Sequence, residues 1–132
     1  MFVSTTRFRV RYAETDAMGI VHHSSYIVWF EEGRSHHMRT LGFPYSRVEA
    51  MGYYFTVVEV HARYLVPARY DEEIQVETWV SDLRSRGLTF QYRVRRVADG
   101  ALLVEGYSRH ICITHDGRPA RIPETLRTLL NQ

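Results

Sequence analysis

A short stretch near the N-terminus brings together groups that suit chemistry at an acyl carbon. Within residues 12–41, Asp16 supplies a carboxylate, Gly19 supplies a turn, and a helix is expected to begin shortly afterwards. A carboxylate can attack a carbonyl group or activate water, and the free backbone N–H groups at the start of a helix can bind a developing oxyanion. The stretch is therefore suited to acyl chemistry.

The chain enters this stretch from an expected strand. Residues 6–13 alternate between apolar residues and arginines, with Phe8, Val10 and Tyr12 on one side. Such alternation predicts a half-buried strand, and the loop of residues 14–23 follows it directly.

One long amphipathic helix is expected to follow the loop. Ser24 or Ser25 can cap its start, and Gly42 and Pro44 follow its expected end near Leu41. Its apolar residues recur at spacings of three and four and form a stripe that a sheet can cover. The stripe contains Tyr26, Trp29, Phe30, Gly33, His37, Met38 and Leu41.

The second half of the chain is rich in expected strands. They cover residues 54–66, 72–83, 87–97 and 101–114, with short helices at 45–51 and 123–130. Asp99-Gly100 between the last two strands is a strong hairpin signal. One strand, a long helix and four further strands predict an α+β fold in a single domain, 1–132, with an antiparallel sheet curved around the helix.

The composition restricts the class of protein. Of the 132 residues, 45% are hydrophobic and 24% charged, which is typical of one soluble domain. No apolar run approaches the roughly 18 residues of a membrane span, and the N-terminus lacks the features of a signal peptide. Cys112 is the only cysteine, so a reducing cytoplasm is the expected location. The net charge of +2 comes from dispersed arginines, which argues against nucleic-acid binding.

The stretch resembles the signature of a known family. RVRYAETDAMGIVHHSSYIVWFEEGR is similar to hotdog-fold acyl-CoA thioesterases of the 4-hydroxybenzoyl-CoA thioesterase and YbgC-like group, and YLVPARYDEEIQVET is similar to their second motif. The resemblance covers nearly the whole chain. It implies a hotdog fold, in which a curved five-stranded antiparallel sheet wraps around a long central helix. The matching residues of the first motif are Tyr12, Thr15, Asp16, Gly19, Val21, His23, Tyr26, Phe30, Glu31 and Arg34.

The resemblance also implies residue roles. Asp16 would be the catalytic carboxylate, acting either as a nucleophile that forms a mixed anhydride or as a general base for water. His23 would polarise the thioester oxygen through its backbone N–H, and Tyr12 would line the same catalytic pocket. Gly19 would let the backbone approach the ligand closely. From the residues alone, Asp16 could instead support the turn of its loop.

A basic turn later in the chain is the candidate for binding coenzyme A. Its 3′-phosphate and pyrophosphate need arginines, and Arg84, Ser85 and Arg86 in DLRSRG are the best placed in the sequence. The alternative is a solvated basic hairpin. The histidines match no standard zinc spacing, so neither a metal nor another cofactor is expected.

The expected function is hydrolysis of an acyl-CoA thioester to a free acid and coenzyme A. A carrier-protein thioester is possible, because both substrates share the phosphopantetheine arm. Two alternatives remain: a non-catalytic binding module for acyl-CoA or acyl carrier protein, and a hotdog hydratase or dehydratase. Members of the family assemble as dimers and tetramers with sites between subunits, so a homodimer or homotetramer is expected.

Overall fold

The computed structural model describes all residues, 1–132. The expected helices and the four later strands are present, with ends shifted by a few residues. None of the helices combines the length and the apolar character that a membrane-spanning helix needs. The elements are β1 (Ser4–Arg9), the 3-10 turn η1 (Tyr12–Glu14), α1 (His23–Thr40), α2 (Tyr45–Ala50), β2 (Tyr53–Tyr64), β3 (Glu73–Ser81), β4 (Gly87–Arg96), β5 (Leu102–Thr114) and α3 (Glu124–Leu130).

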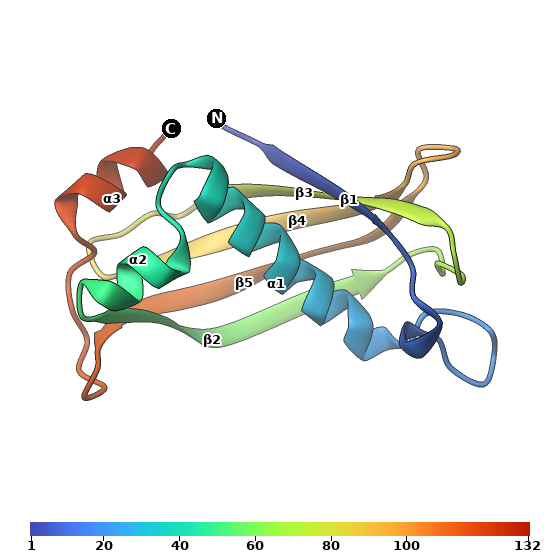
Figure 1. Ribbon diagram of the computed structural model, residues 1–132, viewed down its shortest axis with the longest axis horizontal. Helices are drawn as coiled ribbons and strands as arrows, with labels where there is room; N and C mark the ends of the chain where they lie inside the picture. The colour runs from blue at the N-terminus through green and yellow to red at the C-terminus, as the bar shows by residue number, and fades with distance from the viewer.

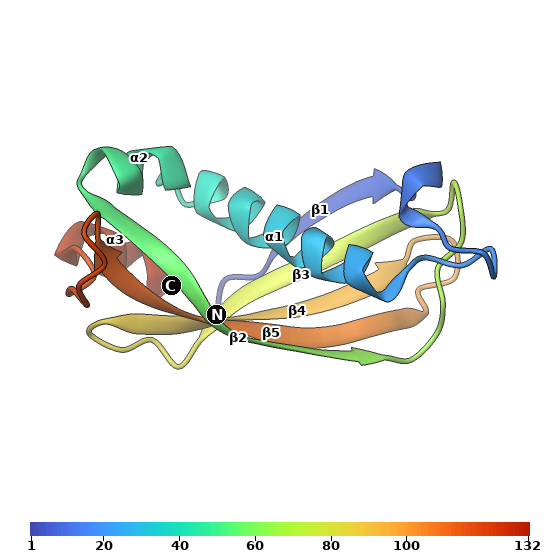
Figure 2. The same ribbon diagram turned by 90° about the horizontal axis from the view of Figure 1, so that it is seen from below.

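The strands form one antiparallel sheet in the order β1-β3-β4-β5-β2. The helix α1 runs along one face of the sheet, which curves beneath it (Figure 1, Figure 2). The hairpin expected at Asp99-Gly100 joins β4 to β5, and Gly100 has the positive φ of 72° that such a turn requires. The arrangement is the curved five-stranded sheet around a central helix that the sequence predicts.

The apolar stripe of α1 packs directly on the sheet. Trp29 and Phe30 are fully buried, and the ring of Phe30 stacks on that of Tyr92 in β4 at 4.3 Å between centroids. Gly33 lets the helix backbone approach β3, because a Cβ there would lie 2.6 Å from Oγ1 of Thr78. This close contact fixes the height of α1 above the sheet, and with it the position of the helix start.

The first strand ends earlier than expected. It stops at Arg9, and Tyr12 lies in η1 with 77% of its surface exposed. The prediction that Tyr12 shares a buried face with Phe8 and Val10 is therefore wrong. The chain turns because the carboxylate of Glu14 accepts a hydrogen bond from the backbone N–H of Arg11 at 2.7 Å, which closes η1.

The expected cap of the long helix is also corrected. His22 caps α1, since its Nδ1 accepts a hydrogen bond from the backbone N–H of Ser24, so neither expected serine is the cap. The strand β2 leaves Val58 and Val60 52% and 41% exposed. This strand lies at the edge of the sheet, and its register with β5 shifts between Val57 and Glu59.

Candidate active site

The loop before α1 holds Asp16 in a closed turn. The backbone N–H of Asp16 donates to the carbonyl of Ile20 at 2.8 Å, and that of Gly19 donates to the carbonyl of Asp16 at 3.0 Å. Oδ1 of Asp16 accepts the N–H of Met18 at 2.8 Å. Gly19 has a φ of +78°, which a glycine adopts without strain. Asp16 thus supports its own turn with one oxygen, while Oδ2 makes no hydrogen bond to the protein.

The start of α1 offers a free hydrogen-bond donor. The backbone N–H of His23 makes no hydrogen bond within the protein, whereas that of Ser24 is taken by the cap at His22. His23 is the first residue of an 18-residue helix, where the helix dipole favours negative charge. The hydroxyl of Tyr64 in β2 donates to the carbonyl of His23 at 2.9 Å and so attaches the helix start to the sheet.

Asp16 and His23 line the same cavity, which has a volume of about 300 Å³. Asp16 is its one carboxylate, and most of the other lining side chains are hydrophobic. A carboxylate and a helix start in an apolar cavity can accommodate an acyl group and polarise its carbonyl. The lining consists of Asp16, Met18, Ile20, Val21, His23, Tyr26, Tyr64, Leu65, Val66 and Pro67.

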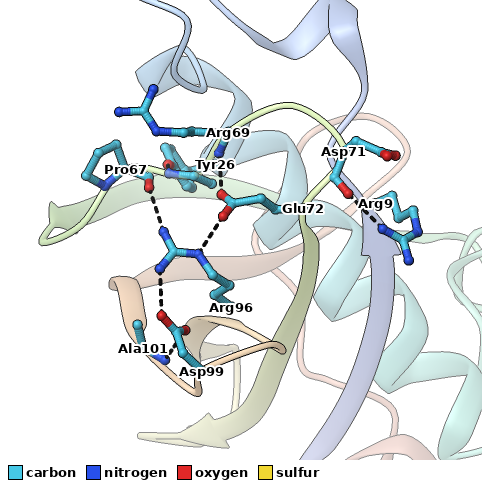
Figure 3. Close-up of polar contacts among 10 residues, drawn as sticks. Arg9, Tyr26, Pro67, Arg69, Asp71, Glu72, Arg96, Asp99 and Ala101 are labelled. Atoms are coloured by element: carbon cyan, nitrogen blue, oxygen red, sulfur yellow. Dashed lines mark hydrogen bonds and ion pairs between the residues drawn. The ribbon is translucent and has the colours of Figure 1, made fainter.

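The segment between β2 and β3 forms one wall of this cavity and is bonded to the Asp16 loop. Ala68 is fully buried; its carbonyl accepts the N–H of Val21 at 2.9 Å, and its own N–H donates to the hydroxyl of Tyr26 at 3.0 Å. Ile20 and Arg69 also pair as an isolated bridge. Polar contacts on the other side of the segment, centred on Arg96, are shown in Figure 3. The wall and the loop therefore form one connected unit.

Glu14 is a buried positioning residue that the sequence reasoning missed. Its Oε2 accepts hydrogen bonds from Trp29 Nε1 at 2.6 Å and from the guanidinium of Arg11 at 2.9 Å. Burial alone would raise the pKa of Glu14, but the bonds from Arg11 and Trp29 outweigh it and hold the pKa below its usual value. In the sequence, only the spacing of three residues between Arg11 and Glu14 could have indicated that the two side chains pair. Its burial depends on Trp29, fifteen residues away.

The structure separates the remaining predicted site residues from Asp16. Tyr12 points into solvent, where its ring packs edge-on against Tyr70 at 5.6 Å, and it does not line the cavity. Arg84, Ser85 and Arg86 line a different cavity of about 310 Å³, in the turn between β3 and β4. That turn lies at the far end of the sheet from the Asp16 loop (Figure 1). Within one subunit, the basic turn and the Asp16 cavity do not adjoin.

Other features of the chain do not add to this site. A cavity of about 240 Å³ between α1, α2 and β2 contains Glu31 and Arg34 but neither Asp16 nor His23. Cys112 is fully buried, and burial raises the pKa of its thiol, as expected for a packed side chain. No three His, Cys, Asp or Glu side chains are grouped so as to hold a metal ion.

Comparisons with known proteins find relatives with a similar fold and sequence. The hypothetical protein TT1821 of Thermus thermophilus has a similar structure, with a TM-score of 0.91 and 48% identity over 97% of both chains. The DHNA-CoA thioesterase of Staphylococcus aureus gives a TM-score of 0.88 with 34% identity, over 92% of this chain and 81% of that one. The acyl-CoA thioester hydrolase YbgC of Escherichia coli is 30% identical and covers 94% of this chain and 96% of its own.

The family model of the thioesterase-like superfamily matches residues 10–130, which include the whole Asp16 loop, α1 and the sheet from β2 to β5. The likeness to solved thioesterases confirms the hotdog fold expected from the sequence. The chain therefore belongs to the thioesterase-like superfamily.

Proposed function

We propose that the protein hydrolyses acyl-CoA thioesters to free carboxylic acids and coenzyme A. The observation that carries the proposal is the pairing of Asp16 with the unbonded backbone N–H of His23 in one apolar cavity. Two of the relatives named above, YbgC of Escherichia coli and the DHNA-CoA thioesterase of Staphylococcus aureus, are named for action on CoA thioesters, which supports the same substrate class here. No metal or redox group enters the proposed reaction, because the carboxylate and water supply its chemistry.

In the proposed reaction, the thioester carbonyl oxygen accepts a hydrogen bond from the N–H of His23. The positive end of the helix dipole stabilises the negative charge that develops on this oxygen. The imidazole of His23 is not required for this step, since the donor is the backbone. Asp16 acts with Oδ2, the oxygen that makes no hydrogen bond to the protein.

Asp16 can act in two ways. As a nucleophile, Oδ2 bonds to the carbonyl carbon, the C–S bond breaks, and coenzyme A leaves as the thiolate; water then hydrolyses the mixed anhydride and regenerates the carboxylate. As a general base, Asp16 takes a proton from the water that attacks the carbonyl carbon, and collapse of the intermediate expels the same thiolate. Both routes consume one water and give the acid and the thiol.

We further propose that the active form is a homodimer or a larger homo-oligomer joined through β2. This strand has one paired edge, on β5, and a free edge with exposed Val57, Val58 and Val60. The other edge strand, β1, is half as long, with six residues against twelve, and offers a shorter edge for pairing. The edge on β2 is therefore the better surface for a second copy.

Antiparallel pairing of two β2 strands would also bring the basic turn of one subunit towards the Asp16 cavity of the other. The turn with Arg84 and Arg86 lies at the end of the sheet where β2 begins, and the Asp16 cavity lies where β2 ends. Two antiparallel β2 strands would bring one subunit's basic turn to the same end as the other subunit's cavity. The arginines could then bind the phosphates of coenzyme A across the interface.

The experiment that tests the function is free-thiol release from short, long and aromatic acyl-CoAs, with wild type beside Asp16→Asn. Asparagine keeps an oxygen that can accept the N–H of Met18, so the turn should persist while the nucleophile or base is lost. We expect a loss of at least about 100-fold in kcat. Asp116→Asn, in the exposed turn after β5, is the control and should retain activity.

Three results would decide between the alternatives. Full activity in Asp16→Asn would remove Asp16 from the mechanism. Binding of acyl-CoA without turnover by either protein would favour the non-catalytic binding module. Hydration of an enoyl-CoA without thiol release would favour the hydratase.

A further inference from the structure

One arginine outside the cavity holds both ends of the segment that forms its wall. Arg96, at the end of β4, has a side chain that is only 18% exposed. Its Nη2 donates to the carbonyl of Pro67 at 3.1 Å, and its Nε lies 2.8 Å from Oε2 of Glu72 (Figure 3). Its Nη1 donates to Oδ2 of Asp99 at 2.9 Å. The planar guanidinium thus makes two hydrogen bonds, to Pro67 and Asp99, and one close ion pair, to Glu72, and a lysine cannot reproduce this set of contacts.

Glu72 in turn binds the backbone of the segment between β2 and β3. Its second oxygen, Oε1, accepts the backbone N–H of Arg69 at 2.6 Å (Figure 3). Arg96 therefore fixes the turn at Pro67 directly and at Arg69 through Glu72. The turn also contains Asp71 with a φ of 64°, a left-handed conformation that is uncommon for a residue other than glycine. A turn of this kind depends on its surroundings to stay in place.

The same turn is bonded to the loop that carries Asp16. Pro67 lines the Asp16 cavity, and Ala68 holds Val21 and Tyr26 through its carbonyl and its N–H. Between Arg96 and Val21 there are only two links: the bond to Pro67, and the bond from Val21 to the adjoining residue, Ala68. A shift of the turn would move the cavity wall and the loop together.

We propose that Arg96 is a positioning residue for the reaction at Asp16. It touches neither the cavity nor Asp16, but it fixes the Pro67 wall against which the thioester is held. This inference rests on the proposed hydrolase function. Displacement of a reacting group by about 1 Å can cost roughly 100-fold in rate. Loss of Arg96 should therefore lower kcat more than it raises KM, because the acyl group still has an apolar cavity to enter.

The neighbouring residue provides a matched control. Arg95 also forms an ion pair, with Nε 2.6 Å from Oε1 of Glu77, and it lies beside Arg96 in sequence. Its one further hydrogen bond is to the carbonyl of Gly100, so it makes no contact with the turn at residues 65–72. Arg95→Gln removes an arginine and an ion pair from the same strand without loosening the cavity wall.

The test compares Arg96→Gln, Arg96→Lys and Arg95→Gln by steady-state kinetics with an acyl-CoA. We expect Arg96→Gln to lower kcat by about 10- to 100-fold, with a smaller change in KM. Arg96→Lys keeps the charge near Glu72 and should recover part of this loss. Arg95→Gln should stay within about twofold of wild type, because Arg95 makes no contact with the turn at residues 65–72. A folded Arg96→Gln with an unchanged kcat would overturn the inference.

Amide hydrogen exchange supplies a readout that does not need turnover. Arg96→Gln should speed exchange at Val21 and Ala68, while Arg95→Gln should leave both amides as in wild type. If wild type releases no thiol from any substrate, the proposed function fails, and the exchange result still decides whether Arg96 positions the loop. If Arg96→Gln does not fold, the folded Arg96→Lys is compared with wild type in the same way. Exchange at Val21 and Ala68 that stays as in wild type would contradict the inference.

Discussion

The indole N–H of Trp29 donates to the carboxylate of Glu14 across 2.6 Å, and both side chains are buried. This bond joins the middle of the central helix to the residue two positions before Asp16. Because Trp29 is fixed in the core, the bond holds the loop that carries the candidate catalytic carboxylate in a defined position relative to α1. The same carboxylate closes η1 through Arg11. One buried charge therefore holds the segment that leads from β1 to Asp16.

We expect Glu14→Gln to destabilise the protein by about 1–3 kcal/mol, because it removes the charged acceptor and leaves Arg11 without its partner. Urea unfolding at pH 7 measures this loss, with exposed Glu32→Gln as the control. The pKa of Glu14 is lowered in the folded state, so its stabilisation is present above the unfolded value of 4.5 and is lost as the pH falls below it. The gap between wild type and Glu14→Gln should therefore narrow in acid; a constant gap would contradict the assignment.

The stability of the protein should also fall in mild acid because of two buried histidines. Burial lowers the pKa of His37 from 6.5 to about 4 and that of His110 from 6.5 to about 3. The unfolded chain therefore takes up protons first, and stability declines as the pH falls from 6.5 towards these folded values. Each proton contributes a slope of about 1.4 kcal/mol per pH unit.

Unfolding free energies between pH 7 and pH 5 test this expectation. His37→Gln and His110→Gln should each flatten the profile in this range, even though both lower stability at pH 7. His115→Gln, at an exposed position after β5, is the control and should leave the slope unchanged. Profiles of equal slope in all four proteins would show that the buried histidines do not govern the acid response.

Gly33→Ala should destabilise the fold although alanine is the better helix former. The helix propensity favours alanine by about 1 kcal/mol. The new Cβ, however, would lie 2.6 Å from Oγ1 of Thr78 and 2.8 Å from Cγ1 of Val76, so the helix and sheet must move apart. Overpacking of this kind costs about 1–3 kcal/mol. Thermal unfolding of Gly33→Ala beside Ser35→Ala measures the effect, and a raised Tm would disprove the close contact.

A lysine on the free edge of β2 should prevent assembly if that edge joins two subunits. Val58→Lys places a charge at the exposed bulge of the strand, where a partner strand would have to bury it. We expect the variant to have the 15.6 kDa mass of one chain in light scattering, while wild type is larger. Thr5→Lys on the other edge strand, β1, should assemble like wild type. Assembly of both variants would place the interface elsewhere.

The sequence by itself determined most of the helices and strands, and it named the two candidate residues Asp16 and His23. Periodicity located the long helix and the strands, because the exposure of alternate or every third and fourth residue is a local property of the chain. The similarity of residues 12–34 to one family selected Asp16 and His23, and these lie in one cavity. The two residues are close in sequence, so a single loop and helix start sufficed to bring them together.

Only the tertiary structure decided which of the other residues join them. Tyr12 lies outside the expected strand because Glu14, which Trp29 holds in the core, closes η1 through the backbone of Arg11. The basic turn between β3 and β4 lies at the far end of the sheet. Arg96 reaches Pro67 across 29 positions of sequence. Contacts of this kind depend on how strands and helix pack, and local patterning carries no information about which distant group will satisfy a buried charge.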